Sequence, residues 1–484
     1  MITNKVLMFA MAMALAATPS TPLVAQSQMS SISPQEKAQG AEANPQLLRE
    51  YGGAYGGPQA AYVRRVGQRI AVQSGLSNAQ SDFTVTLLNS PVDNAFAIPG
   101  GYIYVTRDLL ALMNDEAELA SVMGHEVGHV AARHARSRQN TANIAGIGTG
   151  LLGALLGNST LGQLVTKGVG YGTQLGILGF SRGQETQADS LGVQYLVGAG
   201  YDPLAASTML ASLAAQNALE ARIGGKTAST ATMFSTHPDP LGRVARTAQH
   251  ARATGVTTGA RNRDAFLAAI DGMIYGDDPA QGVVDGQTFR HPALRITFTA
   301  PAGFTVTNGT DAVTVAGPGG KATFSGGAYE GDLDAYLRGV LKSLAPDGTL
   351  DVPRARIFKM NGVDAATVTM GAATQSGPVD VTVMAYAVEP KVAYHFVLVA
   401  ARGSAVGPFR PLVESFRRLS ATEVAAIRPR RLKVVTVERG DSVATLAARM
   451  AYPSMKIERF CVLNGLGPDD VVRPGQKIKL VVIG

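Results

Sequence analysis

The chain has 484 residues, too many for one ordinary domain, so two to four domains are expected. With 46% hydrophobic and 16% charged residues, the composition suits a globular protein and excludes wholesale disorder. The formal net charge of +7 is modest, and no basic stripe is interleaved with aromatic residues, so no nucleic-acid partner is expected. The single cysteine, Cys461, excludes an intrachain disulfide and a cysteine-based zinc site.

The N-terminus has the pattern of a secretory signal peptide. Lys5 supplies a positive charge, and the apolar run over residues 6–17 is short for a bilayer span. Small residues follow, and cleavage is expected near Ala25. We therefore expect residues 1–25 to be a signal peptide and the mature chain to be exported to the periplasm. An uncleaved anchor is the alternative.

The pattern over residues 27–106 predicts short helices and short strands. Residues 27–58 predict a loose lead-in with one short helix, and the helical spacing of apolar residues over 59–73 predicts another. Residues 83–88 predict a strand, and 94–105 predict two strands joined by a Pro-Gly-Gly turn. Thr106 is placed to cap a short helix.

The helix predicted over Ala117–His134 carries the first catalytic candidates. It contains His125, Glu126 and His129 as H-E-x-x-H. Positions i and i+4 of a helix lie on the same face, so both imidazoles can reach one metal ion. Glu126 can then reach a water molecule bound to that ion. The apolar residues around the motif predict a buried helix.

The stretch Asn140–Ser181 is rich in Gly, Ala and Leu and contains one charge, Lys167. Its length would allow a membrane span, but its glycines and polar residues argue against one. We expect apolar helices over 140–180 that pack near the catalytic helix or contact a membrane surface. An ordinary buried helix is the alternative.

Two motifs near this stretch are typical of other sites. A G-x-G-x-x-G motif begins at Gly148, but no strand precedes it, so a dinucleotide site is rejected. A G-x-S-x-G motif surrounds Ser181, with Asp202 and His237 downstream in the order of a catalytic triad. Because no hydrolase sheet is visible upstream, a serine hydrolase remains only an alternative.

A helix predicted over Glu185–Ala199 supplies the remaining metal chemistry. A catalytic zinc site needs three protein ligands and an open fourth position. Glu185 is suited to be the third ligand, and Asp189, on the same helical face, can accept a hydrogen bond from a ligand imidazole. The alternative is a solvated helix face with two acids. Further helices are expected over 202–219 and 243–254.

Four motifs together resemble the HtpX and BepA-like metallopeptidases, relatives of the eukaryotic CAAX prenyl protease. They are NAFAIPGGYIYV from Asn94, HEVGH from His125, the pair Glu185 and Asp189, and STHP around His237 followed by Arg243. The resemblance covers roughly residues 50–254. It implies a gluzincin fold, in which active-site helices pack beside a small sheet whose edge strand binds an extended peptide.

The resemblance also implies which residues hold the substrate. The edge strand would pair with a peptide by β-augmentation. Its predicted substrate-binding residues are Asn94, Ala95, Phe96, Ala97, Pro99 and Gly100. BepA-like proteins carry helical repeats after the peptidase domain, and none is visible here, so their outer-membrane partners are not carried over.

His237 has two possible roles in such a site. Its imidazole can occupy the fourth metal position and silence the enzyme, or it can donate to the developing oxyanion. Arg243 then holds the loop or shares the oxyanion role. We favour the silencing role, because a protease of broad specificity needs restraint. A purely structural histidine is the remaining alternative.

After residue 259 the pattern changes. Alternating strands followed by a covering helix, twice, predict an α+β sandwich of unknown role over 259–420. The isolated His291 and His395 are interpreted as structural. Residues 421–433 are interpreted as a basic linker.

Residues 434–484 resemble a LysM domain. The pattern is strand, helix, helix, strand, with Asp441 and Asn464 at characteristic positions. The family implies binding to glycans that contain N-acetylglucosamine, hence to peptidoglycan, and assigns Asp441 and Asn464 to that contact. A packing module without a glycan groove is the alternative.

The sequence therefore predicts an α+β multidomain protein with a mainly helical gluzincin domain over 26–258, the sandwich and a βααβ module. Its predicted function is that of a periplasmic metalloendopeptidase with one Zn²⁺ per chain. The predicted substrates are misfolded or misassembled envelope proteins, and the LysM-like module tethers the enzyme to peptidoglycan. Glu126 is the expected general base. The alternatives are a non-cleaving chaperone or scaffold and the serine hydrolase.

Overall fold

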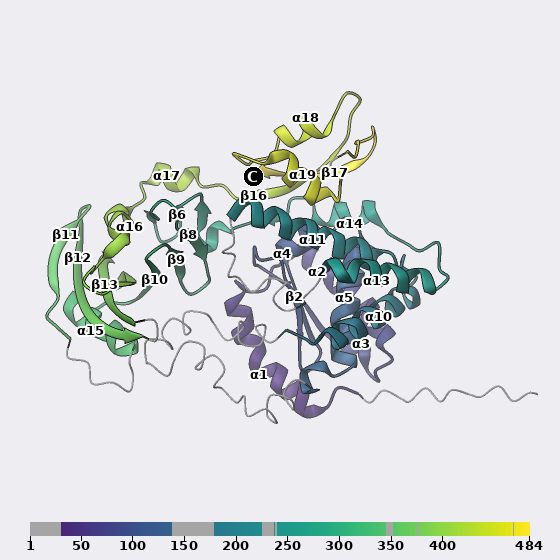
Figure 1. Cartoon of the computed structure of the whole chain (residues 1–484), viewed down its shortest axis with the longest axis horizontal. Coiled ribbons are helices and arrows are strands. Elements are labelled where there is room, and N and C mark those ends of the chain that lie inside the picture. Colours follow the sequence, from purple (N-terminus) through teal and green to yellow (C-terminus); the bar gives the residue numbers. More distant parts are fainter. Residues whose placement is uncertain are drawn as a thin grey trace, which may run out of the picture.

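The computed structural model describes residues 31–137, 179–224, 237, 240–344, 352–374, 377–467 and 469–484. The expected signal peptide and nearly all of the apolar 140–180 stretch lie outside these ranges. Figure 1 shows a helical part that contains α1 to α14, a green sandwich to one side, and a yellow C-terminal module above α11 and α14. The predicted multidomain α+β class is confirmed.

The helical part surrounds a three-stranded sheet with the order β1-β3-β2. Its strands are β1 (Thr84–Leu88), β2 (Ala95–Ile98) and β3 (Tyr102–Thr106). β1 is parallel to β3, and β2 is antiparallel to it. Gly100 and Gly101 make the tight turn between β2 and β3 at φ 88° and 81°, a region that favours glycine. β2 therefore lies at the edge of the sheet.

Helices cover both faces of this sheet. They are α1 (Pro34–Glu50), α2 (Gly57–Ala71), α3 (Ala79–Asp82), α4 (Arg107–Leu112), α5 (Glu116–Ala131), α10 (Arg182–Gly198), α11 (Ala205–Gly224), α13 (Pro240–Ala253) and α14 (Arg263–Ile270). α1 packs on one face, and α2 and α5 pack on the other. α1 has 17 residues, so the prediction of a short helix was wrong; a capping box of Ser33 and Glu36 starts it. No helix in the described ranges is both long and apolar enough to cross a bilayer.

Glycines bring the two helices of the candidate site together. A Cβ atom added to Gly124 of α5 would lie 3.2 Å from the Cα atom of Gly192 on α10. A Cβ atom added to Gly128 would lie 3.2 Å from the carbonyl oxygen of Ala188. Each distance is shorter than ordinary van der Waals contact, so larger residues would push the helices apart. The glycines therefore set the spacing between the H-E-x-x-H helix and the helix of Glu185.

The sandwich has a seven-stranded antiparallel sheet with the order β11-β12-β13-β14-β10-β9-β8 and a four-stranded sheet with the order β15-β7-β6-β5. Helix α15 (Leu333–Leu344) covers the outer face of the larger sheet, and α16 (Arg410–Ser415) packs with the smaller one. The strands are β5 (Val283–Asp285), β6 (Thr288–His291), β7 (Ile296–Thr299), β8 (Thr305–Asn308), β9 (Val313–Gly317), β10 (Gly320–Ala328), β11 (Arg356–Met360), β12 (Val363–Thr374), β13 (Gly377–Glu389), β14 (Val392–Ala401) and β15 (Arg417–Arg418). His395 is buried between Ser325 and Tyr336, and burial lowers its pKa to about 4.

The C-terminal module consists of β16 (Arg430–Thr436), α18 (Val443–Ala448), α19 (Lys456–Asn464) and β17 (Lys477–Ile483). β16 pairs with β17 and also with β4 (Ile274–Tyr275), which precedes the sandwich in the chain. Residues 421–433, expected to be a linker, instead form α17 (Ala421–Ala426) and the first part of β16. The module is thus joined to distant parts of the chain by main-chain pairing.

The module also shares a hydrophobic core with the helical part. Leu432, Phe460 and Leu480 belong to the same buried cluster as residues of α2, α4 and α5. The side chain of Lys479 is fully buried, and its Nζ donates to the carbonyl oxygens of Ala111 at 2.7 Å and Met113 at 2.6 Å. Carbonyls at a helix C-terminus have no partner within the helix, so Lys479 satisfies the end of α4. α5 begins a few residues later.

Candidate metal centre

Four side chains converge on one point between α5 and α10. They are His125, His129, Glu185 and His237, all buried, and one ligand atom from each lies within 4.8 Å of the others. The Nε2 atoms of His125 and His129 are 3.0 Å apart, and Nδ1 of His237 lies 2.9 Å from Oε1 of Glu185. Three imidazoles and a carboxylate are the donor types that hold zinc in proteins. The structure therefore brings together the predicted ligands, including His237.

Asp189 and Arg243 contact the ligand residues and fix their orientation. Oδ1 of Asp189 lies 3.0 Å from Nδ1 of His125, which leaves Nε2 of that ring for a metal. Arg243 donates to both carboxylate oxygens of Asp189 at 2.6 and 2.8 Å and lies 2.8 Å from Glu185. Such bidentate pairing fixes geometry as well as charge. Arg243 thus links the third ligand to the residue that orients the first.

The charges around these acids shift their pKa values. Burial favours the protonated form of Glu185, but the neighbouring His237 and His125 outweigh it and hold its pKa well below its usual range. For Asp189, hydrogen bonds from Arg243 and His125 likewise outweigh burial and lower its pKa. Both carboxylates are therefore anionic at neutral pH. For His125, burial and Arg243 favour the neutral ring, but Asp189 and Glu185 raise its pKa to about 9.

His134, the first histidine after the motif, orients His129. Nε2 of His134 lies 3.1 Å from Oε1 of Gln187, an acceptor, so the proton of His134 is on Nε2. Its Nδ1 therefore accepts from Nδ1 of His129 at 2.8 Å, which leaves Nε2 of His129 for a metal. Burial lowers the pKa values of both rings and keeps them neutral. Sequence reasoning missed His134, although a third histidine just after the motif was a visible signal.

Phe180 was also missed. Its ring stacks on His129, with centroids 3.8 Å apart and an interplanar angle of 21°. The ring shields one face of a ligand from water. Phe180 directly precedes Ser181, so it sits where the chain enters the helix of Glu185. An isolated aromatic residue in a Gly-rich stretch carries no sequence pattern that reveals such a contact.

Glu126 is the residue of the site whose carboxylate has the fewest hydrogen-bond partners. It is fully buried, and neither oxygen of its carboxylate has a hydrogen-bond partner among the described residues. Nε2 of His237, also unpartnered within that range, lies 3.5 Å from its Oε1. Burial raises the pKa of Glu126. Because an unpaired buried carboxylate is costly, these atoms fit a site that holds a metal and a water molecule.

The predicted substrate strand lies beside this centre. In β2, antiparallel pairing with β3 alternates, so the N–H and C=O groups of Ala95 and Ala97 point away from β3. Ala95 is fully buried, whereas Ala97 is partly exposed at the edge. A cavity of about 250 Å³ runs along this edge. Its walls include Ala97, Pro99, Gly100, His129 and Phe180. The edge strand and a metal ligand thus face the same space.

The residues of the alternative serine triad do not meet. The Ser181 hydroxyl accepts from the N–H of Gln184 as the N-cap of α10. Asp202 accepts from Arg261, and His237 belongs to the metal cluster. The G-x-S-x-G motif is therefore a helix start, and the serine hydrolase alternative was wrong. The other glycine motif, from Gly148, lies outside the described residues.

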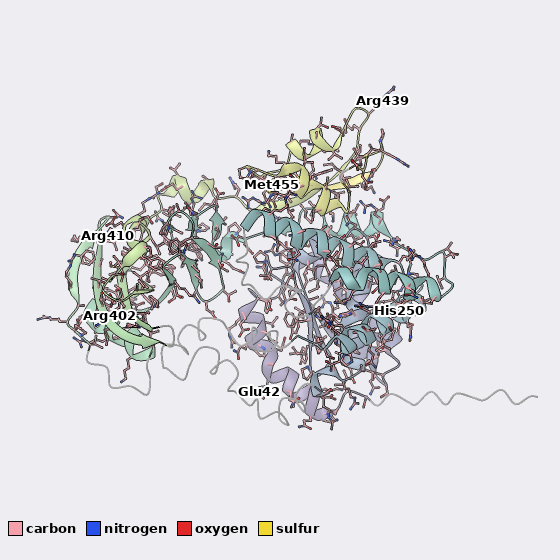
Figure 2. All side chains as sticks on the ribbon, viewed as in Figure 1. Glu42, His250, Arg402, Arg410, Arg439 and Met455 are labelled. Atoms are coloured by element: carbon pink, nitrogen blue, oxygen red, sulfur yellow. The ribbon has the colours of Figure 1, made fainter. Side chains whose placement is uncertain are left out.

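The two residues assigned to glycan differ in exposure. Asn464 is buried; its amide donates to the carbonyls of Phe460 and Lys479 and accepts from the N–H of Lys479. Its side chain therefore holds the module together and is turned away from any sugar. Asp441 shapes the loop before α18 by accepting from the N–H of Glu438. Figure 2 shows Arg439 of that loop projecting outward from the tip of the module.

Comparison with known proteins agrees with this geometry. Residues 58–251 match peptidase family M48, and residues 435–481 match the LysM domain. A beta-barrel assembly-enhancing protease of Yersinia pestis is 31% identical over 224 residues, 45% of this chain and 44% of that protein. Its namesake in Escherichia coli (strain K12) is 32% identical over 189 residues, 38% of this chain and 37% of that protein.

A mitochondrial metalloendopeptidase of Schizosaccharomyces pombe is 32% identical over 213 residues, 43% of this chain and 59% of that protein. The match to the two bacterial relatives spans less than half of their length. The match to peptidase family M48 covers the part of the chain that holds the metal cluster. Residues 58–251 are a zinc-dependent metallopeptidase domain of peptidase family M48, and residues 435–481 are a LysM domain.

Proposed function

We propose that this protein is a periplasmic zinc metalloendopeptidase that cleaves misfolded or misassembled envelope proteins. The observation that carries the proposal is the buried, unpartnered carboxylate of Glu126 beside a cluster of three histidines and Glu185. A general base with no structural partner is costly to keep unless chemistry uses it. The relatives named as proteases support the same activity.

Each residue has a defined role in this proposal. His125, His129 and Glu185 would hold one zinc ion, which would supply a Lewis acid and lower the pKa of a water molecule to around 7. Glu126 accepts a proton from the attacking water and delivers it to the leaving amine. Arg243 and Asp189 keep the ligands aligned, and the neutral His134 holds the tautomer of His129.

Substrate recognition rests on the free edge of β2. An extended peptide that adds to this edge bonds to main-chain groups of Ala97, which every peptide can do irrespective of its sequence. Such pairing requires the substrate to be extended, so folded proteins are poor substrates and unfolded segments are good ones. That selectivity suits the removal of misfolded chains.

Metal removal tests the proposed activity. Cleavage of an unfolded protein such as casein is expected to stop when a zinc chelator is added and to return when zinc is restored, because the ligand set binds one ion. A serine-directed reagent is expected to leave cleavage unchanged. A purified, zinc-loaded chain that shows no cleavage of unfolded proteins would instead favour the non-cleaving chaperone or scaffold.

His237 is proposed to restrain the enzyme as a fourth ligand. Its Nδ1 lies 2.9 Å from Glu185 and 3.2 Å from Nε2 of His125, within the ligand cluster. His237→Ala is expected to raise basal casein cleavage at saturating zinc, because the fourth position opens to water, and to weaken zinc binding modestly. A fall of about 10²-fold would contradict restraint and identify a transition-state donor.

The matched control for that experiment is His250→Ala. His250 lies on α13, away from the ligand cluster, and contacts Ser190 at 3.1 Å (Figure 2). Its replacement is expected to leave both cleavage and zinc affinity near those of the wild type. An increase in cleavage in both variants would point to general loosening of the fold.

The LysM domain is proposed to bind peptidoglycan. The exposed loop around Arg439 is available for contact, although Asn464 is not. The full chain is expected to sediment with purified peptidoglycan, and soluble oligomers of N-acetylglucosamine are expected to release it. Asp441→Ala should weaken the interaction, because the loop loses its main-chain bond, whereas Asp364→Ala in the sandwich should not. A chain that stays in the supernatant at low and moderate salt would make the domain a packing module.

A further inference from the structure

A second cavity, of about 470 Å³, lies where the three parts of the molecule meet. The metallopeptidase part contributes Asp93 and residues of α11, the sandwich contributes residues of β5 and β8, and the C-terminal module contributes Arg430, Tyr452 and Arg459. Figure 1 shows the sandwich strand β8 to one side of α11 and the C-terminal module above that helix. No residue that lines this cavity takes part in the metal centre, so the proposed proteolysis leaves it without a role.

One wall of the cavity is cationic. The guanidinium carbon of Arg459 lies 4.2 Å from the ring centroid of Tyr452, and that of Arg430 lies 5.2 Å from the same centroid. The Nε atoms of both arginines are buried and have no hydrogen-bond partner within the described ranges. Arg430 is 3.9 Å from Asp285, whose side chain is 63% exposed and therefore a weak partner. Two preoriented guanidinium groups thus have donors to spare for a carboxylate.

Acidic side chains line the same space. They are Asp93, Asp108, Glu220 and Asp277. Each aspartate has partners of its own: Asp93 accepts from Gln216, and Asp277 accepts from the N–H of Val284. Asp108 accepts from the N–H of Gly276 and lies 3.5 Å from the guanidinium of Arg107.

Burial raises the pKa values of Asp93 and Asp277 and raises that of Asp108 to about 6. Burial outweighs the opposing effects of Arg107 on the pKa of Asp108 and of Arg430 and Arg107 on that of Asp277. Oδ1 of Asn308, another lining atom, is buried without a partner among the described residues. The acidic wall can therefore accept several hydrogen bonds from a ligand.

The cationic wall and the acidic wall together limit which ligands can bind in the cavity. A simple anion would face four carboxyl groups, and a simple cation would face two guanidinium groups, so neither charge alone is matched. A molecule with both charges satisfies both walls. The volume is that of sites for small organic ligands, and Val92, Leu219 and Met450 add apolar surface for a short hydrocarbon body.

We propose that this cavity binds a short peptide in zwitterionic form, with its free carboxylate at Arg430 and Arg459 and its free ammonium at Asp93 and Asp277. Two sources share this chemistry: the products of protein cleavage and the peptide portions of peptidoglycan. Because the ligand contacts all three parts of the chain, it stabilises their arrangement. The proposal does not depend on the activity of the metal centre.

Calorimetric titration of the full-length Glu126→Gln variant with L-Ala-L-Ala-L-Ala tests the proposal without cleavage of the probe. Saturable binding is expected, together with a rise in the thermal unfolding temperature. N-acetylation of the tripeptide removes the ammonium, and C-amidation removes the carboxylate. Each is expected to weaken binding about tenfold or more, as the loss of a charged hydrogen bond does.

Arg459→Gln in the same background identifies the cavity. It is expected to weaken binding at least about tenfold, whereas Arg449→Gln, at an exposed arginine directly after α18, should not. If Arg459→Gln is poorly folded, Arg430→Gln serves in its place. No binding up to about 10 mM tripeptide would overturn the proposal. So would equal binding by Arg459→Gln and its parent, since the peptide would then occupy another site.

A tripeptide that ends in D-Ala-D-Ala distinguishes the two sources. Tighter binding of this peptide than of the all-L peptide assigns the cavity to cell-wall peptides, and the reverse order assigns it to products of proteolysis. Either order must be lost in Arg459→Gln if the ligand lies in this cavity.

Discussion

Glu126→Gln is expected to keep zinc and to lose cleavage of an unfolded protein by at least about 10²-fold, the contribution expected of a general base. The amide has nearly the shape of the carboxylate and leaves His125, His129 and Glu185 untouched. It cannot accept the proton of the attacking water. Because neither carboxylate oxygen has a hydrogen-bond partner in the described part of the chain, the change breaks no hydrogen bond and alters only the 3.5 Å contact with Nε2 of His237.

Two measurements on the purified protein check this expectation: zinc content and the rate of casein cleavage. Glu42→Gln is the matched control, because Glu42 is exposed on α1 (Figure 2) and belongs neither to the metal cluster nor to the cavity beside β2. Its cleavage rate should equal that of the wild type. A cleavage rate near wild type in Glu126→Gln would remove Glu126 from the mechanism.

Glu185→Ala is expected to produce the second large effect, a loss of zinc affinity. It removes a ligand and also leaves Arg243 without the partner that lies 2.8 Å from it. Asp189→Ala keeps all ligands but frees the His125 ring, so zinc affinity should fall by roughly 10- to 100-fold, as for other residues that orient a ligand. The loss in Glu185→Ala should be larger.

Titration of both variants against a chelator of known affinity measures the difference. Asp364→Ala, a surface change in the sandwich, is the control for purification and handling. Full zinc occupancy of Glu185→Ala under chelator competition would show that the third ligand lies elsewhere. Equal losses in both variants would mean that Asp189 binds the metal directly.

The parts of the site that could be predicted are those encoded by local periodicity. His125 and His129 are one helical turn apart, and so are Glu185 and Asp189, so the sequence places each pair on one face of a helix. The distance between the two helices was not predictable, because it depends on Gly124 meeting Gly192 across a contact between distant segments. His134 was missed for a related reason: it acts beyond the end of the helix, where the 3.6-residue period no longer applies.

The relation between the modules was predicted least well. Residues 421–433 have the composition of a linker, yet they contain α17 and part of β16. β16 pairs with β4, more than 150 residues earlier, and no local pattern announces such a partner. No local pattern in the sequence predicts that Lys479 is buried. Lys479 is buried because its Nζ donates to carbonyl oxygens at the end of α4, which lies in a distant part of the sequence.

If the LysM domain binds peptidoglycan as proposed, the core that it shares with the catalytic part has a mechanical consequence. Lys479 joins the LysM domain to the end of α4, directly before the helix of His125. The domain is therefore held rigidly against the catalytic part and is not connected to it by a flexible linker. When the domain is bound to the wall, the cavity beside β2 stands at one height and faces one direction. The enzyme then samples only the layer within its own radius, and its targets must diffuse to it.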